Sequence, residues 1–269
     1  QCIDQNGNEW TFELLRQVDD AVADIALNEF KLDIYPNQIE VISSEQMLDA
    51  YSSGAMPVMY PHWSYGNSLS VNEHLYETGQ QNLAYEVVIN SNPCISYLME
   101  ENTLTMQTLV IAHACYGHNS FFKGNYLFRQ WTQADAIIDY LVFAKNYVME
   151  CEEKYGFAAV EEVLDAAHSI QHLGVDRYKR RFESEAVVKA RKDVLDEDKR
   201  RHYDEIMAKV SPIEAAQLER KQDNYPPEPV ENVLYFIEKE APKLKAWERE
   251  LVRIVRKMSQ YFYPQGQTK

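Results

Sequence analysis

The sequence is poor in the features that mark disulfide-bonded, membrane-spanning and polyanion-binding proteins. It has few cysteines, far apart and without a C-x-x-C spacing, which predicts reduced and mostly buried thiols at Cys2, Cys94, Cys115 and Cys151. No apolar run approaches the roughly 18 residues that span a bilayer, and no signal peptide opens the chain. We therefore expect a cytoplasmic protein with no membrane partner. The formal net charge of −15 also argues against nucleic acid, because such partners select basic surfaces.

Familiar catalytic motifs are missing as well. The chain has no P-loop, no dinucleotide-binding G-x-G-x-x-G, no G-x-S-x-G nucleophile elbow and no H-E-x-x-H zinc motif. Any enzymatic activity must therefore depend on residues that no standard motif identifies. What the chain does have is length and apolar content: 269 residues, of which 45% are hydrophobic, are ample for a buried core.

Helical periodicity dominates and predicts an α+β protein that is predominantly α-helical, with a small β element. Apolar residues recur at helical spacing over 11–30, 103–117, 132–155 and about 158–173. Thr132 and Asp135 have the spacing of an N-cap and N3 pair for the third of these helices. Two further helices are expected near the C-terminus.

The β element is expected at 82–94, where a β-branched core ends on the turn signal Asn-Ser-Asn-Pro. Before it, an extended piece leads into a short helix that Ser43 caps. The proline- and glycine-containing segment 54–68 is typical of a structured loop.

Charge density divides the chain into three parts. Residues 1–181 are expected to form the main helical domain with the histidine-bearing helices. Residues 182–232 are rich in charged side chains and end on a Pro-rich stretch, which predicts a solvated helical arm and a connector. Residues 233–269 are predicted to be a helical pair that packs back on the core, with Pro242 in the first turn of its second helix.

The stretch "LVIAHACYGHNSFF" places two histidines five residues apart inside the most apolar predicted helix. On an ideal α-helix, His113 and His118 would lie about 140° apart and could not share a ligand. They converge only if the helix deforms or ends between them, and Gly117 permits such a bend because glycine tolerates a left-handed conformation. Two neutral imidazoles could then bind one metal ion, zinc above all. The alternative is a pair of core histidines that hydrogen-bond to neighbours.

A second group of polar residues lies in "AVEEVLDAAHSIQHLG", where Glu161, Asp165, His168 and His172 share one helical stripe. Asp165 and His168 form an i, i+3 carboxylate–imidazole pair of the kind that helical bundles use for metals. Asp165 can equally orient His168 as a metal-binding or proton-relaying histidine. An exposed polar face is the alternative for the stripe, and it suits Glu161 and His172 better than His168.

Three more residues are candidates for a site. Glu86 is a carboxylate in an otherwise apolar strand, where it can serve as a general base or lie on an exposed strand face. His62 and Trp63 belong to the aromatic loop "YPHWS", the type of segment that lines pockets. Cys115 between the histidine pair is expected to be a small buried thiol rather than a nucleophile.

In their order along the chain, these segments resemble the SpoVR family, named for a stage V sporulation protein. The stretches that carry the resemblance cover about three quarters of the chain and include "LDIYPNQIEVISSEQMLDAYSS", "MPVMYPHWSYG", "LAYEVVINSNPCISYLMEENTLTMQTLVIAHACYGHNSFFKGNYLF", "YGFAAVEEVLDAAHSIQHLGVDRYKR" and the C-terminal segment from Glu231. Family members usually have a lysine where this chain has Asn67. The family sequence continues past Lys269 into a Glu-Gly-Trp-Ala helix, so we expect a fragment that lacks the C-terminal part.

A helix with two histidines followed by this further helix resembles the arrangement of zincin-type metallopeptidases. In those enzymes one helix gives two histidine ligands and a later helix gives a glutamate. The resemblance implies a zincin-like helical core in which His113 and His118 hold zinc and a third ligand lies beyond this chain. From the second helical stripe, His168 is a further candidate ligand. Zincins carry a catalytic glutamate after the first histidine; because Ala114 stands here, Glu86 is the expected base. The predicted function is a metal-dependent hydrolase of peptide or amide bonds in sporulation or stationary-phase stress physiology.

Two alternatives remain open. In the first, the protein is a non-catalytic regulatory partner in a signalling module. The resemblance suggests a PrkA-type serine kinase and a von Willebrand A-like protein as its partners, because their genes often neighbour those of the family. In the second, the protein holds iron in an oxidative site built on Glu86, Asp165 and His168.

Overall fold

The computed structural model describes residues 10–176, 190, 193–194, 197 and 231–267. Most of the predicted charged arm at 182–232 lies outside the described residues. The described part is mostly helical with a small mixed sheet, which confirms the predicted predominantly α-helical α+β class but shows no zincin-like core. No helix in the described part is long and apolar enough to cross a membrane.

The sheet has three strands in the order β1-β3-β2. β1 (Asn37–Ile42) runs parallel to β3 (Cys94–Met99), and β2 (Glu86–Ile89) pairs with β3 in antiparallel register. The predicted Asn-Ser-Asn-Pro turn joins β2 to β3 and contains a cis Asn92–Pro93 bond. β3 itself was not predicted: its residues form a largely buried central strand, whereas the expected strand 82–94 ends where β3 begins.

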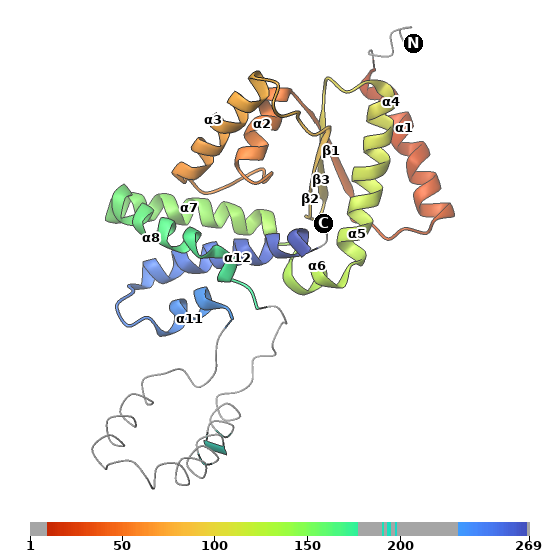
Figure 1. The fold of residues 1–269 in the computed structure, drawn as a ribbon. Coiled ribbons are helices and arrows are strands. Elements are labelled where there is room, and N and C mark those ends of the chain that lie inside the picture. The colour runs from red at the N-terminus through yellow and green to blue at the C-terminus, as the bar shows by residue number, and fades with distance from the viewer. Residues whose placement is uncertain (1–9, 177–189, 191–192, 195–196, 198–230, 268–269) are drawn as a thin grey trace, which may run out of the picture.

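One face of the sheet is covered by the N-terminal helix and the histidine-bearing segment (Figure 1). These elements are α1 (Phe12–Asp24), the π-helix η1 (Ile25–Glu29), α4 (Leu104–Val110), the π-helix η2 (Ile111–His118) and α5 (Asn119–Gly124). Leu98 of β3 packs with Leu15, Ile111 and Cys115 in their common core. The predicted helix 103–117 therefore continues to residue 124, but its middle is π-helical.

The larger core lies on the other face, against a layer of long helices (Figure 1). Ile89 of β2 and Ile95 of β3 belong to this core. The layer contains α7 (Ile137–Tyr155), α8 (Phe157–Ser169) with the 3-10 turn η3 (Gln171–Leu173), α11 (Val233–Glu240) and α12 (Ala246–Gln267). Side chains two residues apart on a strand share a face and adjacent ones do not, so Val88 and Ile89 serve opposite cores. The short helix α6 (Tyr126–Trp131) connects the two layers.

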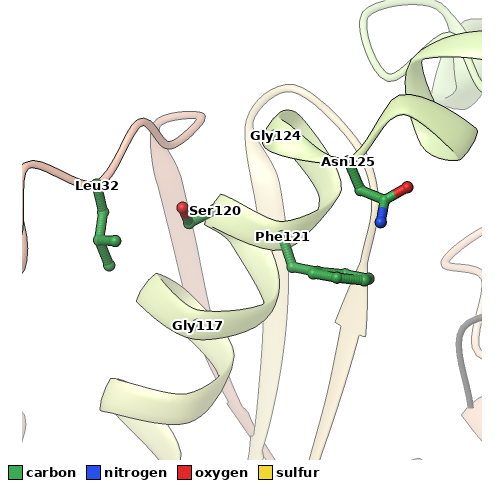
Figure 2. Close-up of a pocket in the computed structure, with 6 residues that line it drawn as sticks. All are labelled: Leu32, Gly117, Ser120, Phe121, Gly124 and Asn125. Atoms are coloured by element: carbon green, nitrogen blue, oxygen red, sulfur yellow. The ribbon is translucent and has the colours of Figure 1, made fainter.

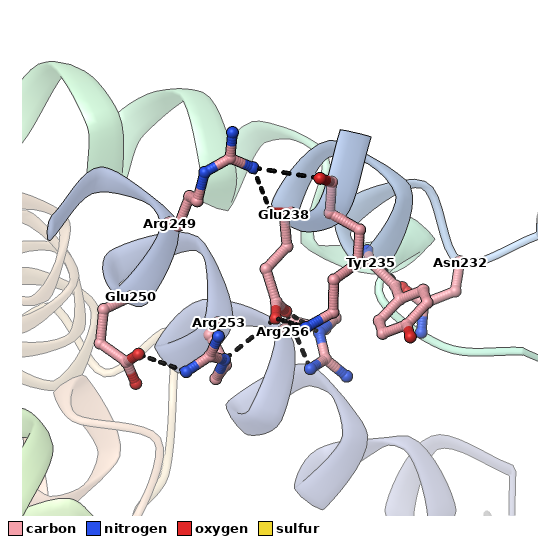
Figure 3. A network of polar contacts seen from close by, with 8 residues as sticks. Asn232, Tyr235, Glu238, Arg249, Glu250, Arg253 and Arg256 are labelled. Atoms are coloured by element: carbon pink, nitrogen blue, oxygen red, sulfur yellow. Dashed lines mark hydrogen bonds and ion pairs between the residues drawn. The ribbon is translucent and has the colours of Figure 1, made fainter. Parts of the chain in front are cut away.

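A buried ion network fastens α11 to α12 (Figure 3). Glu238, only 2% exposed, accepts hydrogen bonds from Arg253 at 3.0 Å and from Arg256 at 2.9 Å. Burial alone would raise the pKa of Glu238, but the charge of Arg256 and the hydrogen bonds from Arg253 and Lys239 outweigh it, so the pKa is lowered. Buried charges of this kind are stable only as pairs.

Several predicted boundaries were wrong. Residues 54–68 are not a continuous loop, because α3 (Trp63–Glu77) begins within them, after α2 (Ser44–Ser52). α7 begins at Ile137 rather than 132, since Thr132 closes α6 and donates its hydroxyl to the Phe128 carbonyl at 2.6 Å. The last helix begins at Ala246 and not at Pro242.

Candidate metal centre

Glu86, His113 and His118 lie together where β2 meets η2. Their ligand atoms are all within 4.8 Å of one another. The ring centroids of His113 and His118 are 4.3 Å apart, and Glu86 Oε1 lies 2.5 Å from Nδ1 of His113. The group is open to solvent on one side, since the His113 side chain is 64% exposed and that of Glu86 16%.

The two rings meet because the helix is π-helical, and not because it bends at glycine. In a π-helix the hydrogen bonds run from i to i+5 and the turn is wider than in an α-helix, so residues five apart lie on the same side of the helix. Gly117 is helical and does not take the left-handed conformation that the sequence analysis expected. The predicted convergence of the rings is thus observed, but its predicted cause was wrong.

Side chains that sequence analysis did not single out fix both sides of this π-helix. The Tyr116 hydroxyl donates to Asp19 Oδ1 at 2.7 Å and ties η2 to α1. The fully buried Asn119 joins the segment to the residues before β1, because its oxygen accepts from the Tyr35 amide at 2.8 Å and its nitrogen donates to the Tyr35 carbonyl at 2.8 Å. A buried asparagine directly after an imidazole is a weak sequence signal, since its partner lies 84 residues away.

The lowered pKa of His118 suits metal binding. Burial, and then the neighbouring charge of His113, lower the pKa of His118 below its ordinary value, and Glu86 opposes this effect. His118 is therefore neutral near pH 7 and has a lone pair to offer. Burial also raises the pKa of the Cys115 thiol to about 12, so this fully buried side chain stays protonated. It lies in the core, as the sequence analysis expected.

An open groove of about 450 Å³ runs along the same helix (Figure 2). Its wall includes Gly117, the neighbour of His118, and the side chains of Ser120 and Phe121, with Leu32 opposite. The lining is mainly apolar. An extended chain with an apolar side chain could therefore lie in it, although Glu86, His113 and His118 are not among the lining residues.

The other predicted site residues form a second cluster between α3 and α8. His168 does not join the first histidine pair: its Nε2 lies 2.6 Å from the Tyr60 hydroxyl, and its ring is 4.2 Å from that of His62. Burial, and then the neighbouring His62, lower the pKa of His168 to about 4. The charge of Asp165 acts in the opposite direction but is outweighed. Asp165 accepts from Trp63 Nε1 at 2.6 Å.

The structure therefore separates residues that the sequence analysis placed together. Within the described ranges, no group of three donors joins His168 to His113 and His118, and none joins Glu86 to Asp165 or His168. The reason is topological: α8 belongs to the helical layer and η2 to the opposite face of the sheet (Figure 1). The zinc and iron sites that sequence analysis built across these elements are not assembled.

Comparison with known families establishes which family the chain belongs to. Residues 9–269 match the family model described as SpoVR like protein. The chain belongs to the SpoVR-like family. The SpoVR-like chain is also 55% identical, over 268 residues, to the "Uncharacterized protein YcgB" of Escherichia coli (strain K12).

That alignment covers 98% of the SpoVR-like chain but 52% of YcgB, so the chain spans about half the length of this curated relative. No solved structure matches the chain.

Proposed function

We propose that this SpoVR-like chain carries the metal centre of a zinc-dependent hydrolase acting on peptide or amide bonds. The observation that carries the proposal is the pair of imidazoles 4.3 Å apart with a carboxylate 2.5 Å from one of them. Histidine nitrogens are ligands that zinc takes in catalytic sites, and a carboxylate beside them can act as a general base. Zinc bound there would polarise a substrate carbonyl and lower the pKa of a water molecule.

Each residue has a distinct role in this proposal. Glu86 accepts a hydrogen bond from Nδ1 of His113 through Oε1, which fixes the ring and leaves the other imidazole nitrogen free to bind the ion. Its second carboxylate oxygen remains to take a proton from the attacking water, the task of a general base. His118, neutral near pH 7, supplies the second nitrogen. The groove beside Gly117 would hold an apolar side chain of the substrate.

The proposed centre shares two histidine donors with zincins but differs from them in its helix. Zincins place two histidines at i and i+4 on an α-helix, with the catalytic glutamate after the first. Here the spacing is i to i+5 on a π-helix, and Ala114, fully buried, follows the first histidine. A carboxylate at that position would face the core, so a base from β2 is needed.

Metal content and hydrolysis, measured on the same preparations, test this proposal. Purified protein loaded with Zn²⁺ should cleave members of a peptide library, and elemental analysis should find zinc. His113→Ala and His118→Ala should each lose this zinc, whereas Glu86→Gln should keep most of it but lose cleavage. The matched control is His172→Ala, which changes an exposed histidine outside both clusters. Zinc content that His113→Ala and His118→Ala leave unchanged would refute the proposal.

A second candidate function is a non-catalytic partner of a PrkA-type serine kinase and a von Willebrand A-like protein. The observation that favours it is Ala114, because the position of the zincin base is filled by a buried methyl group. Co-purification with such a kinase, unchanged by His113→Ala and without peptide cleavage, would support this candidate. Iron instead of zinc in the elemental analysis would point to oxidative chemistry.

A further inference from the structure

The cluster between α3 and α8 contains a buried carboxylate that the fold itself does not satisfy. Glu161 is 8% exposed, and both of its carboxylate oxygens are inaccessible to solvent and without a hydrogen-bond partner. The nearest opposite group is Nε2 of His62, 3.5 Å away, which carries a charge only when the imidazole is protonated. An ionised carboxylate in such surroundings requires a cation or hydrogen-bond donors.

Negative charge accumulates around Glu161 without side-chain cations to balance it. Asp165 lies one helical turn further along α8, and its Oδ1 is 3.2 Å from Nε2 of His62. Glu152 of α7 has a buried oxygen without a partner, and burial together with the charge of Glu161 raises its pKa. Within the described part of the chain, no lysine or arginine forms an ion pair with any of the three carboxylates.

His62 is oriented so that Nε2 faces the carboxylates and Nδ1 contacts Ser64. It caps the N-terminus of α3, where Nδ1 lies 2.6 Å from the Ser64 hydroxyl oxygen. Nδ1 also accepts a hydrogen bond from the Ser64 amide at 3.3 Å, so an ion can take the lone pair of Nε2 only in the tautomer in which Nδ1 donates to the Ser64 hydroxyl. Trp63 holds Asp165 by donating to its Oδ1 at 2.6 Å.

We propose that His62, Glu161 and Asp165 form a second metal site, which binds a divalent transition-metal ion through one imidazole nitrogen and carboxylate oxygens. The donor atoms of these residues all lie within 4.8 Å of one another. Mixed nitrogen and oxygen donors suit ions such as Zn²⁺, Fe²⁺ and Mn²⁺. His168 covers the His62 ring at 4.2 Å and is itself held by Tyr60, so it walls the site without being a ligand. Asp165, whose side chain is 49% exposed, gives the ion a way in.

This site shares no residue with the proposed hydrolase centre and lies on the other side of the sheet (Figure 1). The two proposals can therefore be tested separately in one experiment. Four versions of the 269-residue chain are compared: the unaltered sequence, His113→Ala with His118→Ala, His62→Gln with Glu161→Gln, and all four substitutions together. Each is stripped with EDTA, saturated with Zn²⁺, desalted and analysed for zinc.

We expect about two, one, one and no zinc equivalents in the four proteins, because a ligand set that loses two of its donors no longer retains the ion. If His62→Gln with Glu161→Gln keeps both equivalents, the second site is refuted whatever happens at the first. If only that pair of substitutions removes zinc, the second site stands and the hydrolase centre falls. Glu162→Gln, one residue along α8 and exposed, is the matched control and should change nothing.

Stability measurements separate a lost ligand from a damaged fold. In EDTA, Glu161→Gln should melt no lower than the unaltered protein, because it removes a buried charge that has no partner. Added Zn²⁺ should raise the melting temperature of the His113→Ala, His118→Ala protein, but not when Glu161→Gln is also present. Ser64→Ala should weaken zinc binding by about 10- to 100-fold without abolishing it. A marked loss of stability of Glu161→Gln in EDTA would show that the carboxylate has protein partners and would overturn the proposal.

Discussion

Substituting alanine for Gly117 tests whether the histidine pair converges through a π-helix or through a glycine bend. Gly117 is helical, and a β-carbon added to it would lie 3.6 Å from the Ala112 carbonyl oxygen, an ordinary contact. Glycine inside a helix is about 1 kcal/mol less favourable than alanine. Gly117→Ala should therefore raise the free energy of unfolding by about 0.5–1 kcal/mol, or the melting temperature by roughly 2–4 °C.

Gly156→Ala is the matched control, because a β-carbon there meets nothing within 4 Å but the backbone has φ of +88°. Its only effect is backbone strain, which we expect to destabilise the protein by about 1–3 kcal/mol. The two variants should thus shift thermal unfolding in opposite directions, while Gly117→Ala retains zinc at His113 and His118. If Gly117→Ala instead destabilises the protein as Gly156→Ala does and releases zinc, the π-helical explanation is wrong.

Three further predictions concern single buried groups. Glu238→Gln should lower stability at pH 7 by about 3 kcal/mol, since it leaves Arg256 without its charged partner. Because the pKa of Glu238 is lowered on folding, its stabilisation is present above the unfolded value of 4.5 and is lost as the pH falls through the folded one. The deficit of the variant in urea titrations should accordingly shrink below about pH 4.5, and a constant deficit would contradict the assignment. Cys115 should resist iodoacetamide in the native protein at pH 8, because its pKa is about 12 and it is fully buried; mass spectrometry should find it labelled only after denaturation. Asn119→Ala should destabilise the protein by about 2–3 kcal/mol and weaken zinc binding at His113, because the partly buried backbone amide and carbonyl of Tyr35 lose their partner. Unchanged zinc affinity would show that the π-helix does not need this anchor.

Local patterns in the sequence were sufficient to predict which elements exist but not where some of them end. The capping pair at Ser43 predicted α2, because both hydrogen bonds of a capping box involve residues three apart. The strand β3 was missed because its sequence, "CISYLM", has no alternation of polar and apolar residues. Both faces of β3 are covered by helices, and the sequence of the strand alone does not reveal that covering.

The candidate site shows the same division. Sequence analysis identified His113, His118 and Glu86, since imidazoles and a carboxylate in apolar segments are conspicuous. It placed His168 with them because spacing along a helix says nothing about which layer the helix joins. An exposed face was the alternative that suited Glu161, yet the residue is 8% exposed, because the N-terminus of α3 covers that side of α8.

The π-helix links these observations to function. An α-helix through 111–118 would keep the apolar side chains of the segment but separate the two histidines by about 140°. The chain adopts the rarer helix where Tyr116, near its end, and Asn119, directly after it, are tied to α1 and to the residues before β1. Neither tie is needed to bury Ile111 or Cys115, which any helix in this position could do. The contacts that favour the π-helix are therefore the contacts that bring the histidines together, and tertiary structure, more than the glycine between them, sets the geometry of this centre.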